Sequence, residues 1–230
     1  MTRAGVRQCL MCATIVALSG TVAAAQSAPA FRRLQITVAA GASLANGYPV
    51  GDVTATLRRN TTGTATPFTL LSAESRVERA SGFEARLGLA LSRAFAVELG
   101  GSYSQPQLGV TVSADPEASA GAFASERIHQ YIVDVSGVYQ LPVTLGRRAR
   151  VYAIGGGGYL RQLHDGRLLV DTGKTIHAGA GLQYWIRRAQ TGRSLGARAE
   201  GRLVRRLGGV EFEERARSFP AISILGFIGF

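Results

Sequence analysis

Seven ionisable side chains lie inside segments whose other residues alternate between apolar and small types. They are Glu84, Arg86, Glu98, Asp134, Arg198, Glu200 and Arg202. Where two or three share a segment they stand two residues apart, and such positions point to the same face of a β-strand. Four acids and three bases are close to balance, as mutual pairing of poorly solvated charges requires. The pattern predicts a network of ion pairs, with a gated proton or ion path as the functional alternative.

The side chains suited to act as bases near neutral pH are His129, His164 and His177. Nucleophilic catalysis needs such a base beside the nucleophile and a third group that orients the base. The histidines stand in the contexts HQY, HDG and HAG, which offer neither a His-x-Ser arrangement nor metal-ligand spacing. His164 is expected in a turn and His177 on the polar face of a strand. The sequence therefore predicts no catalytic residue, no metal and no cofactor.

Eight segments with period-two alternation are expected to be β-strands. They cover residues 33–44, 80–91, 94–104, 128–141, 149–162, 174–187, 195–206 and 219–230. Their lengths suit tilted strands that cross a bilayer, which need about 9–11 residues. GGGGY at 155–159 is followed by no helical pattern, so it is interpreted as part of a strand and not as a phosphate-binding loop.

The connections between these segments alternate in length. SR, PVTLGRR and RRAQTGRS form short turns, whereas long loops rich in Gly, Pro, Asn, Asp and Thr cover residues 45–79, 105–127, 163–173 and 207–218. An even number of antiparallel strands, with short turns at one end and long loops at the other, is the layout of an outer-membrane β-barrel. Because an open sheet edge has no water to bond in lipid, the last strand is expected to pair with the first.

Apolar and charged residues fall on opposite faces of these segments, as Phe83 and Leu87 against Glu84 and Arg86 illustrate. Alternation alone does not decide which face points outward. The polar faces are rich in Gly, Ala and Ser, as a narrow eight-stranded interior requires, so the apolar faces are expected to contact lipid. Aromatic residues near segment ends are expected to form interfacial girdles. These residues are Phe95, Tyr131, Tyr139, Tyr152, Tyr184, Phe219 and Phe230.

The first 25 residues have the properties of a secretory signal peptide. Arg3 and Arg7 precede an apolar run, and an A-x-A site stands just before Gln26. Both cysteines, Cys9 and Cys12, lie in this segment, so the remaining chain has no thiol for a disulfide or a metal. The predicted organisation is a signal peptide at 1–25 and one domain at 26–230, an all-β, eight-stranded antiparallel up-and-down transmembrane β-barrel.

The chain ends in ISILGFIGF, in which Ile222, Ile224, Ile228 and Phe230 share one face. This ending, the signal peptide, the eight alternating segments, GGGGY at 155–159 and GAGLQYW at 179–185 resemble small outer-membrane barrels of the OmpA/OmpX type. In that family an alternating apolar segment with a C-terminal aromatic residue is read by the barrel-assembly machinery. The resemblance implies that these four residues are an assembly signal, and it implies no periplasmic peptidoglycan-binding domain.

The net charge is +11, and its excess gathers at the short-turn end. The arginines of that end are Arg93, Arg147, Arg148, Arg150, Arg187, Arg188 and Arg193. Strand count and an exported N-terminus place these turns in the periplasm, where they are expected to contact anionic phospholipid head groups. Binding of nucleic acid is not expected, because no recognisable reading element accompanies the arginines.

The predicted function is therefore an integral outer-membrane barrel with a structural or surface-interaction role. Its lumen is closed by charged side chains, and an extracellular ligand is expected, if at all, at loops 45–79 and 105–127. Two alternatives stay open. A soluble periplasmic lipid carrier would turn its apolar faces inward, and a lipid A-modifying barrel would use one of the three histidines.

Overall fold

The computed structural model describes residues 35–57, 68–113, 122–146, 148–165, 169–187, 193–210 and 216–230. The predicted signal peptide, Arg147 and Arg188 lie outside these residues. Eleven strands are present in the described chain. They are β1 (Gln35–Ala45), β2 (Tyr48–Leu57), β3 (Phe68–Val77), β4 (Ala80–Ala90), β5 (Phe95–Ser104), β6 (Gln107–Ser113), β7 (Ala122–Leu145), β8 (Ala149–His164), β9 (Val170–Arg187), β10 (Ser194–Gly208) and β11 (Arg217–Gly229). No helix in this part of the chain is long and apolar enough to cross a membrane.

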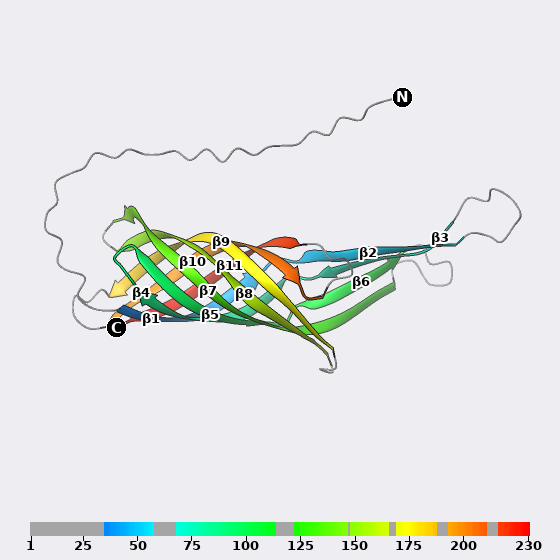
Figure 1. Ribbon diagram of the computed structural model, residues 1–230, viewed down its shortest axis with the longest axis horizontal. Coiled ribbons are helices and arrows are strands. Elements are labelled where there is room, and N and C mark those ends of the chain that lie inside the picture. The colour runs from blue at the N-terminus through cyan, green and yellow to red at the C-terminus, as the bar shows by residue number, and fades with distance from the viewer. Residues whose placement is uncertain are drawn as a thin grey trace, which may run out of the picture. The chain divides into compact units, whose positions relative to one another are not determined.

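Eight of the strands close into an antiparallel barrel, as predicted (Figure 1). Going round the wall, the order is β1, β4, β5, β7, β8, β9, β10 and β11, and β11 pairs with β1. The closing pair keeps one register from Thr37 opposite Gly229 to Ala45 opposite Ala221. Closure satisfies the backbone hydrogen bonds of every wall strand, which is the condition for spanning lipid with strands.

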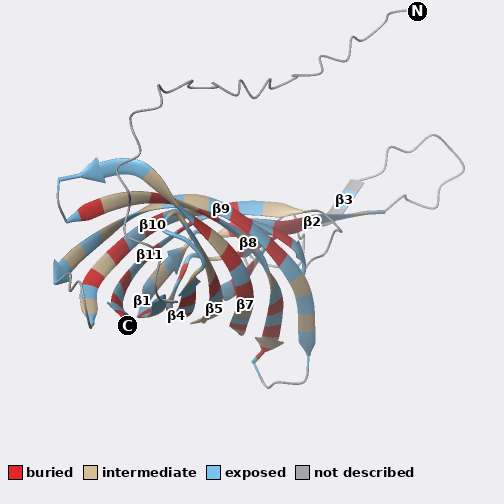
Figure 2. Ribbon diagram, turned by 60° about the vertical axis from the view of Figure 1, so that its left-hand side comes forward, coloured by how far each residue is buried: buried red, intermediate tan, exposed pale blue. Residues whose placement is uncertain are grey.

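Apolar side chains face outward on the barrel and charged side chains face inward, as Figure 2 shows by the alternating burial along each strand. On β4, Phe83 is 75% exposed whereas Glu84 and Arg86 are 3% and 2% exposed. The same reversal repeats on β7, where Val133 and Val135 are exposed and Asp134 is buried. A soluble carrier needs the opposite arrangement, so the soluble alternative does not fit this fold.

Two of the four predicted long loops contain β-strands. Segment 45–79 contains β2 and β3, and segment 105–127 contains β6 and the first part of β7. Together they form a sheet in the order β2-β3-β6-β7 that continues the wall beyond one end of the barrel (Figure 1). These segments were expected to be loops because Pro49, Gly51 and Pro106 interrupt the alternation. The structure instead pairs them as antiparallel strands, and β2 and β3 pair with register shifts at Pro49/Gly51 and Ala55/Thr56.

Two members of the predicted aromatic girdle point inward. Tyr152 is buried in the lumen and Phe219 stacks on Tyr48 with ring centroids 4.8 Å apart. Phe95, Tyr131, Tyr139, Tyr184 and Phe230 are exposed on the outer surface, as expected. The error arose because position near a strand end does not fix the face of a side chain, which depends on register.

Candidate functional site

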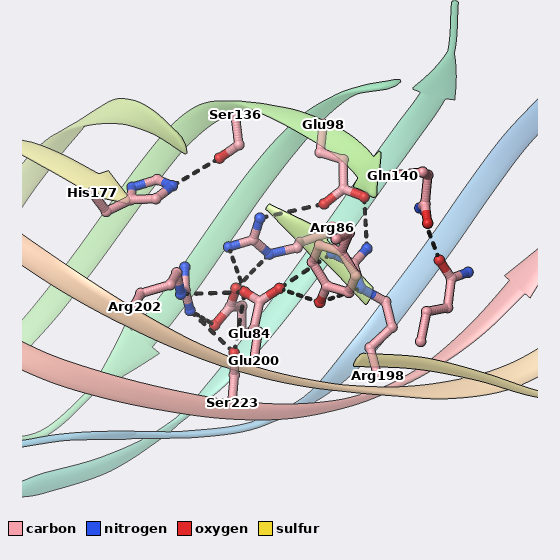
Figure 3. Close-up of polar contacts among 12 residues, drawn as sticks. Glu84, Arg86, Glu98, Ser136, Gln140, His177, Arg198, Glu200, Arg202 and Ser223 are labelled. Carbon is pink, nitrogen blue, oxygen red and sulfur yellow. Dashed lines mark hydrogen bonds and ion pairs between the residues drawn. The ribbon is translucent and has the colours of Figure 1, made fainter. Parts of the chain in front are cut away.

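Six of the seven predicted charged residues meet in the barrel lumen (Figure 3). β4 contributes Glu84 and Arg86, β5 contributes Glu98, and β10 contributes Arg198, Glu200 and Arg202. β4 and β10 are separated in the wall by β1 and β11, so the side chains reach one another across the interior. We call these six residues the lumen network. Its three acids and three bases carry no net charge.

Arg86 contacts a carboxylate from each of three strands. Its Nε lies 2.5 Å from Glu84 Oε1, its Nη1 lies 3.3 Å from Glu98 Oε2, and its Nη2 lies 3.4 Å from Glu200 Oε1. The planar guanidinium suits this role because its donors diverge in a fixed fork. Arg86 therefore connects β4, β5 and β10 through the centre of the barrel.

The other two arginines complete the pairing. Arg198 Nη1 lies 2.6 Å from Glu98 Oε1 and its Nη2 lies 3.2 Å from Glu200 Oε2. Arg202 Nε lies 3.2 Å from Glu200 Oε1, and its Nη2 contacts Glu84. Each carboxylate thus meets at least two guanidinium groups. This multiple pairing offsets the desolvation that buried ions suffer.

Tyr152 and Ser223 extend the lumen network, and the sequence reading did not find them. The Tyr152 hydroxyl donates to Glu200 Oε2 at 2.7 Å and accepts from Arg198 Nε at 3.1 Å. Ser223 donates to Glu200 Oε1 at 3.3 Å. The inward face of β8 carries no acidic residue to mark it, but the register partner of Tyr152 offers a signal. Gly181 stands opposite Tyr152, and any side chain there would overlap the tyrosine ring.

Asp134 stands apart from the lumen network. It accepts a hydrogen bond from Ser136 Oγ at 2.8 Å, and the same hydroxyl lies 3.0 Å from His177 Nε2. A Ser-His-Asp triad needs the carboxylate on the far nitrogen of the imidazole, where it orients the base. Here the carboxylate contacts the serine, and Asp134 Oδ1 lies 4.0 Å from His177 Nε2. The three residues are buried polar partners without the geometry of a triad.

Apolar layers lie on both sides of the lumen network. At the end that carries the β2-β3-β6-β7 sheet, an apolar plug fills the barrel. Its buried members are Tyr48, Val50, Val77, Leu108, Ile128, Val204, Val210, Phe219 and Ala221. At the short-turn end, smaller clusters form around Leu225 and Phe227 and around Tyr152 and Ile154. Charged and apolar groups thus occupy the interior in successive layers.

Arg206 ties the apolar plug to the barrel wall. Its guanidinium lies over the Tyr48 ring, 5.0 Å from the centroid, and also contacts the Tyr48 hydroxyl. It donates to the carbonyl oxygens of Gly208 at 2.6 Å and Val210 at 2.7 Å. Gln162 accepts from the Val210 N–H at 3.0 Å, so this end of the lumen is held by hydrogen bonds as well as by apolar contact.

His164 lies at the mouth of the barrel, at the last residue of β8 and not in the predicted turn. Its Nδ1 lies 3.0 Å from Glu126 Oε2 and its Nε2 lies 2.9 Å from Asp171 Oδ2. Burial acts to lower the pKa of His164, but the hydrogen bonds and charges of the two carboxylates outweigh burial and raise that pKa above its ordinary value of 6.5. The contact joins β7, β8 and β9 at this mouth.

Of the predicted basic residues of the short turns that are described, four are exposed, whereas Arg150 is half-buried with its guanidinium 5.8 Å from the centroid of the Trp185 ring. Arg93, Arg148, Arg187 and Arg193 all lie at the end of the barrel opposite the added sheet. Arg193 places its guanidinium 5.4 Å from the centroid of the Phe230 ring.

The side chains of the predicted assembly-signal residues point outward from β11 and from the residue that follows it. They are Ile222, Ile224, Ile228 and Phe230.

Within the part of the chain that the structure describes, no group of three or more His, Cys, Asp or Glu side chains is arranged to hold a metal ion. His129 faces outward, with its Nδ1 2.8 Å from the Tyr103 hydroxyl. The three histidines therefore lie in three separate surroundings, one outside the wall, one at the mouth and one in the lumen.

No protein-family model and no curated protein matches the sequence. Among solved structures, the chain is similar to the outer membrane protein OprG from Pseudomonas aeruginosa, with a TM-score of 0.50 and 10% identity over 86% of this chain and 96% of OprG. A match to Ail, the attachment invasion locus protein of Yersinia pestis, has a TM-score of 0.38 and 11% identity over 86% of this chain and all of Ail. The outer membrane protease OmpT from Escherichia coli matches with a TM-score of 0.27 and 9% identity over 85% of this chain and 94% of OmpT. The OprG likeness and the closed wall agree that the chain has the fold of a small eight-stranded outer-membrane β-barrel.

Proposed function

We propose that this protein is an integral outer-membrane barrel with a closed lumen, which carries an external β-sheet as an interaction surface and performs no catalysis. The observation that supports the proposal best is the reversal of faces, with apolar side chains outside and the lumen network inside. Such a surface is stable only where lipid covers it. Residues 1–25 serve as the export signal.

The short turns face the periplasm in this proposal. The eight strands leave both described ends of the barrel, Gln35 and Phe230, on the short-turn side. The exposed arginines of that side are suited to the anionic phospholipid of the inner leaflet. Phe230 and the outward isoleucines of β11 are the signal for the barrel-assembly machinery. The β2-β3-β6-β7 sheet then projects outside the cell.

The lumen is closed to ions in this proposal. An eight-stranded barrel has an interior about wide enough for its own side chains. The lumen network with Tyr152 and the apolar plug occupy this interior at two levels, and a cavity of about 60 Å³, lined by residues of both, is left between them. Ion passage would require several paired charges to separate together in a poorly solvated space, which is costly.

The external sheet supplies the interaction surface. Within the described chain β2 pairs on one side only, with β3, so its other edge is open beyond the barrel. Open edges present unpaired N–H and C=O groups to which another extended chain can bind. The outer half of β2 carries few charges that would block such pairing, and Val53 is exposed there.

Membrane insertion is tested by fractionation and by gel migration of heated and unheated protein. We expect sedimentation with outer membranes and a faster unheated band. Protein purified in detergent and inserted into planar bilayers should give no conductance steps. Soluble protein in the periplasm would refute the membrane assignment, and steady openings would refute the closed lumen alone.

Orientation is tested by single-cysteine labelling, because the chain beyond residue 25 contains no cysteine. Val53→Cys on β2 and Arg93→Cys in the β4–β5 turn are matched exposed positions at opposite ends. A membrane-impermeant maleimide should label Val53→Cys on intact cells and Arg93→Cys only after the outer membrane is permeabilised. The reverse pattern would invert the proposed topology.

A further inference from the structure

A groove of about 420 Å³ opens on the outer wall of the barrel across β1, β4, β5 and β7. Its floor is a cross-strand row of small outward residues, because Ala40 stands opposite Ala85 and Ala85 stands opposite Gly101. The space above Gly101 is open, with no atom within 4 Å of the place that a Cβ would take. The wall is therefore hollowed along this row of small residues.

The row next to this floor, on the side of the external sheet, is aromatic. Phe83 stands opposite Tyr103, and Tyr103 stands opposite Tyr131, with the two tyrosine rings 5.0 Å apart between centroids. Together with Val133 these rings form the sides of the groove. Aromatic side chains with one polar end are typical of the boundary between hydrocarbon and head groups. The groove thus begins at that boundary and continues into the hydrocarbon.

Basic and polar groups continue the aromatic row and lie beyond it. Arg161 of β8 is the register partner of Tyr131, and His129 stands two residues above Tyr131 and contacts the Tyr103 hydroxyl. Arg127 follows on the same face, about 13 Å from Tyr131 along the strand at 3.3 Å per residue. Arg127 and Arg161 are exposed, and neither forms an ion pair with a described acidic side chain.

We propose that this groove binds one outer-leaflet lipid, with an acyl chain on the small-residue floor and a phosphorylated head group at Arg127 and Arg161. An apolar groove inside the bilayer selects a hydrocarbon chain, and two exposed cations at its head-group end select an anion. The inference rests on the proposed membrane location and orientation. A second copy of the chain is a less suitable occupant of the groove. It would have to cover the whole groove with an apolar surface, and it would leave Arg127 and Arg161 without a role.

The test uses full-length protein purified in mild detergent and native mass spectrometry with added lipid A that carries both phosphates. We expect one lipid A to stay bound to the wild-type chain. Gly101→Leu fills the groove and should weaken binding about tenfold, as expected from the loss of contact with about two methylene groups. Gly201→Leu is the matched control, because Gly201 is an outward glycine of β10 with equally open space above it.

The head-group contact is tested with Arg127→Ala combined with Arg161→Ala. This variant should weaken binding of the doubly phosphorylated lipid and leave binding of dephosphorylated lipid A unchanged. Equal binding by Gly101→Leu and Gly201→Leu, or a mass of two chains that Gly101→Leu abolishes, would overturn the proposal. Heat-dependent gel migration is recorded for every variant, so that an unfolded variant is not counted as a loss of lipid binding. Absence of the shift in the wild type would refute the proposed membrane function instead.

Discussion

Arg198 Nη1 lies 2.6 Å from Glu98 Oε1 across the lumen, although 100 residues separate the two in sequence. The pair joins β10 to β5, which are not neighbours in the barrel wall. Backbone pairing connects each strand only to the next one round the wall, whereas the lumen network connects opposite sides. The stability of the closed barrel should therefore depend on it.

Replacing Arg86 by methionine should destabilise the barrel by about 3–5 kcal/mol, because carboxylates of Glu84, Glu98 and Glu200 lose a shared partner while they stay buried. The measurement is urea-induced unfolding from lipid vesicles, followed by the fluorescence of Trp185, the single tryptophan of the chain. A change below about 1 kcal/mol would contradict a structural role of the network.

The matched control is Arg76→Met on β3. Arg76 Nε lies 3.2 Å from Glu78 Oε1, but both side chains are exposed on the external sheet. Exposed pairs of this kind contribute about 0–1 kcal/mol. The contrast between the two arginines isolates the effect of burial from the loss of one positive charge.

Placing alanine at Gly181 should destabilise the barrel, since the added Cβ would overlap the Tyr152 ring and push its hydroxyl away from Glu200. Overpacking of this kind typically costs about 1–3 kcal/mol. The same unfolding experiment measures the loss. Gly201→Ala meets no neighbour within 4 Å and should leave stability unchanged. Equal stability of both variants would mean that Tyr152 does not need this space.

His164 should make stability depend on pH. Since the fold raises its pKa above 6.5, its contribution is fully present below that ordinary pKa and is lost as pH rises through the folded value. The expected result is a wild-type chain that loses stability between pH 6.5 and the more alkaline folded pKa, and a smaller loss in His164→Gln. Unfolding free energies measured across this range for the wild type and for His164→Gln provide the check, and equal profiles of the two would contradict the prediction.

Phe230→Ala should reduce the amount of assembled barrel in cells without preventing refolding of purified protein. The backbone N–H of Phe230 donates to the Ile36 carbonyl at 2.9 Å, and alanine preserves this bond. The assembled fraction is measured as the heat-dependent band in outer membranes. Phe95→Ala, another exposed aromatic near the short-turn end, serves as the control and should assemble normally. Equal assembly of the two variants would remove Phe230 from the proposed signal.

The sequence by itself determined the wall of the barrel. Period-two alternation indicates where the eight wall strands run. The charges of β4, β5, β7 and β10 indicate which face of each of these strands avoids lipid. Both properties can be predicted from the sequence because neither depends on distant residues. Small residues on the polar face favoured an inward direction for the charges, and the burial of Glu84 and Arg86 agrees with that reading.

Only the tertiary structure decided which of these charges meet and what surrounds them. The distance between Arg198 and Glu98 depends on barrel closure and strand register, which place side chains of β5 and β10 at one level. The same register turned Tyr152 inward, brought His164 between two carboxylates, and aligned Ala40, Ala85 and Gly101 into one groove floor. A sequence pattern records the face of a residue along its own strand, whereas its partners belong to strands whose register is set by the whole sheet.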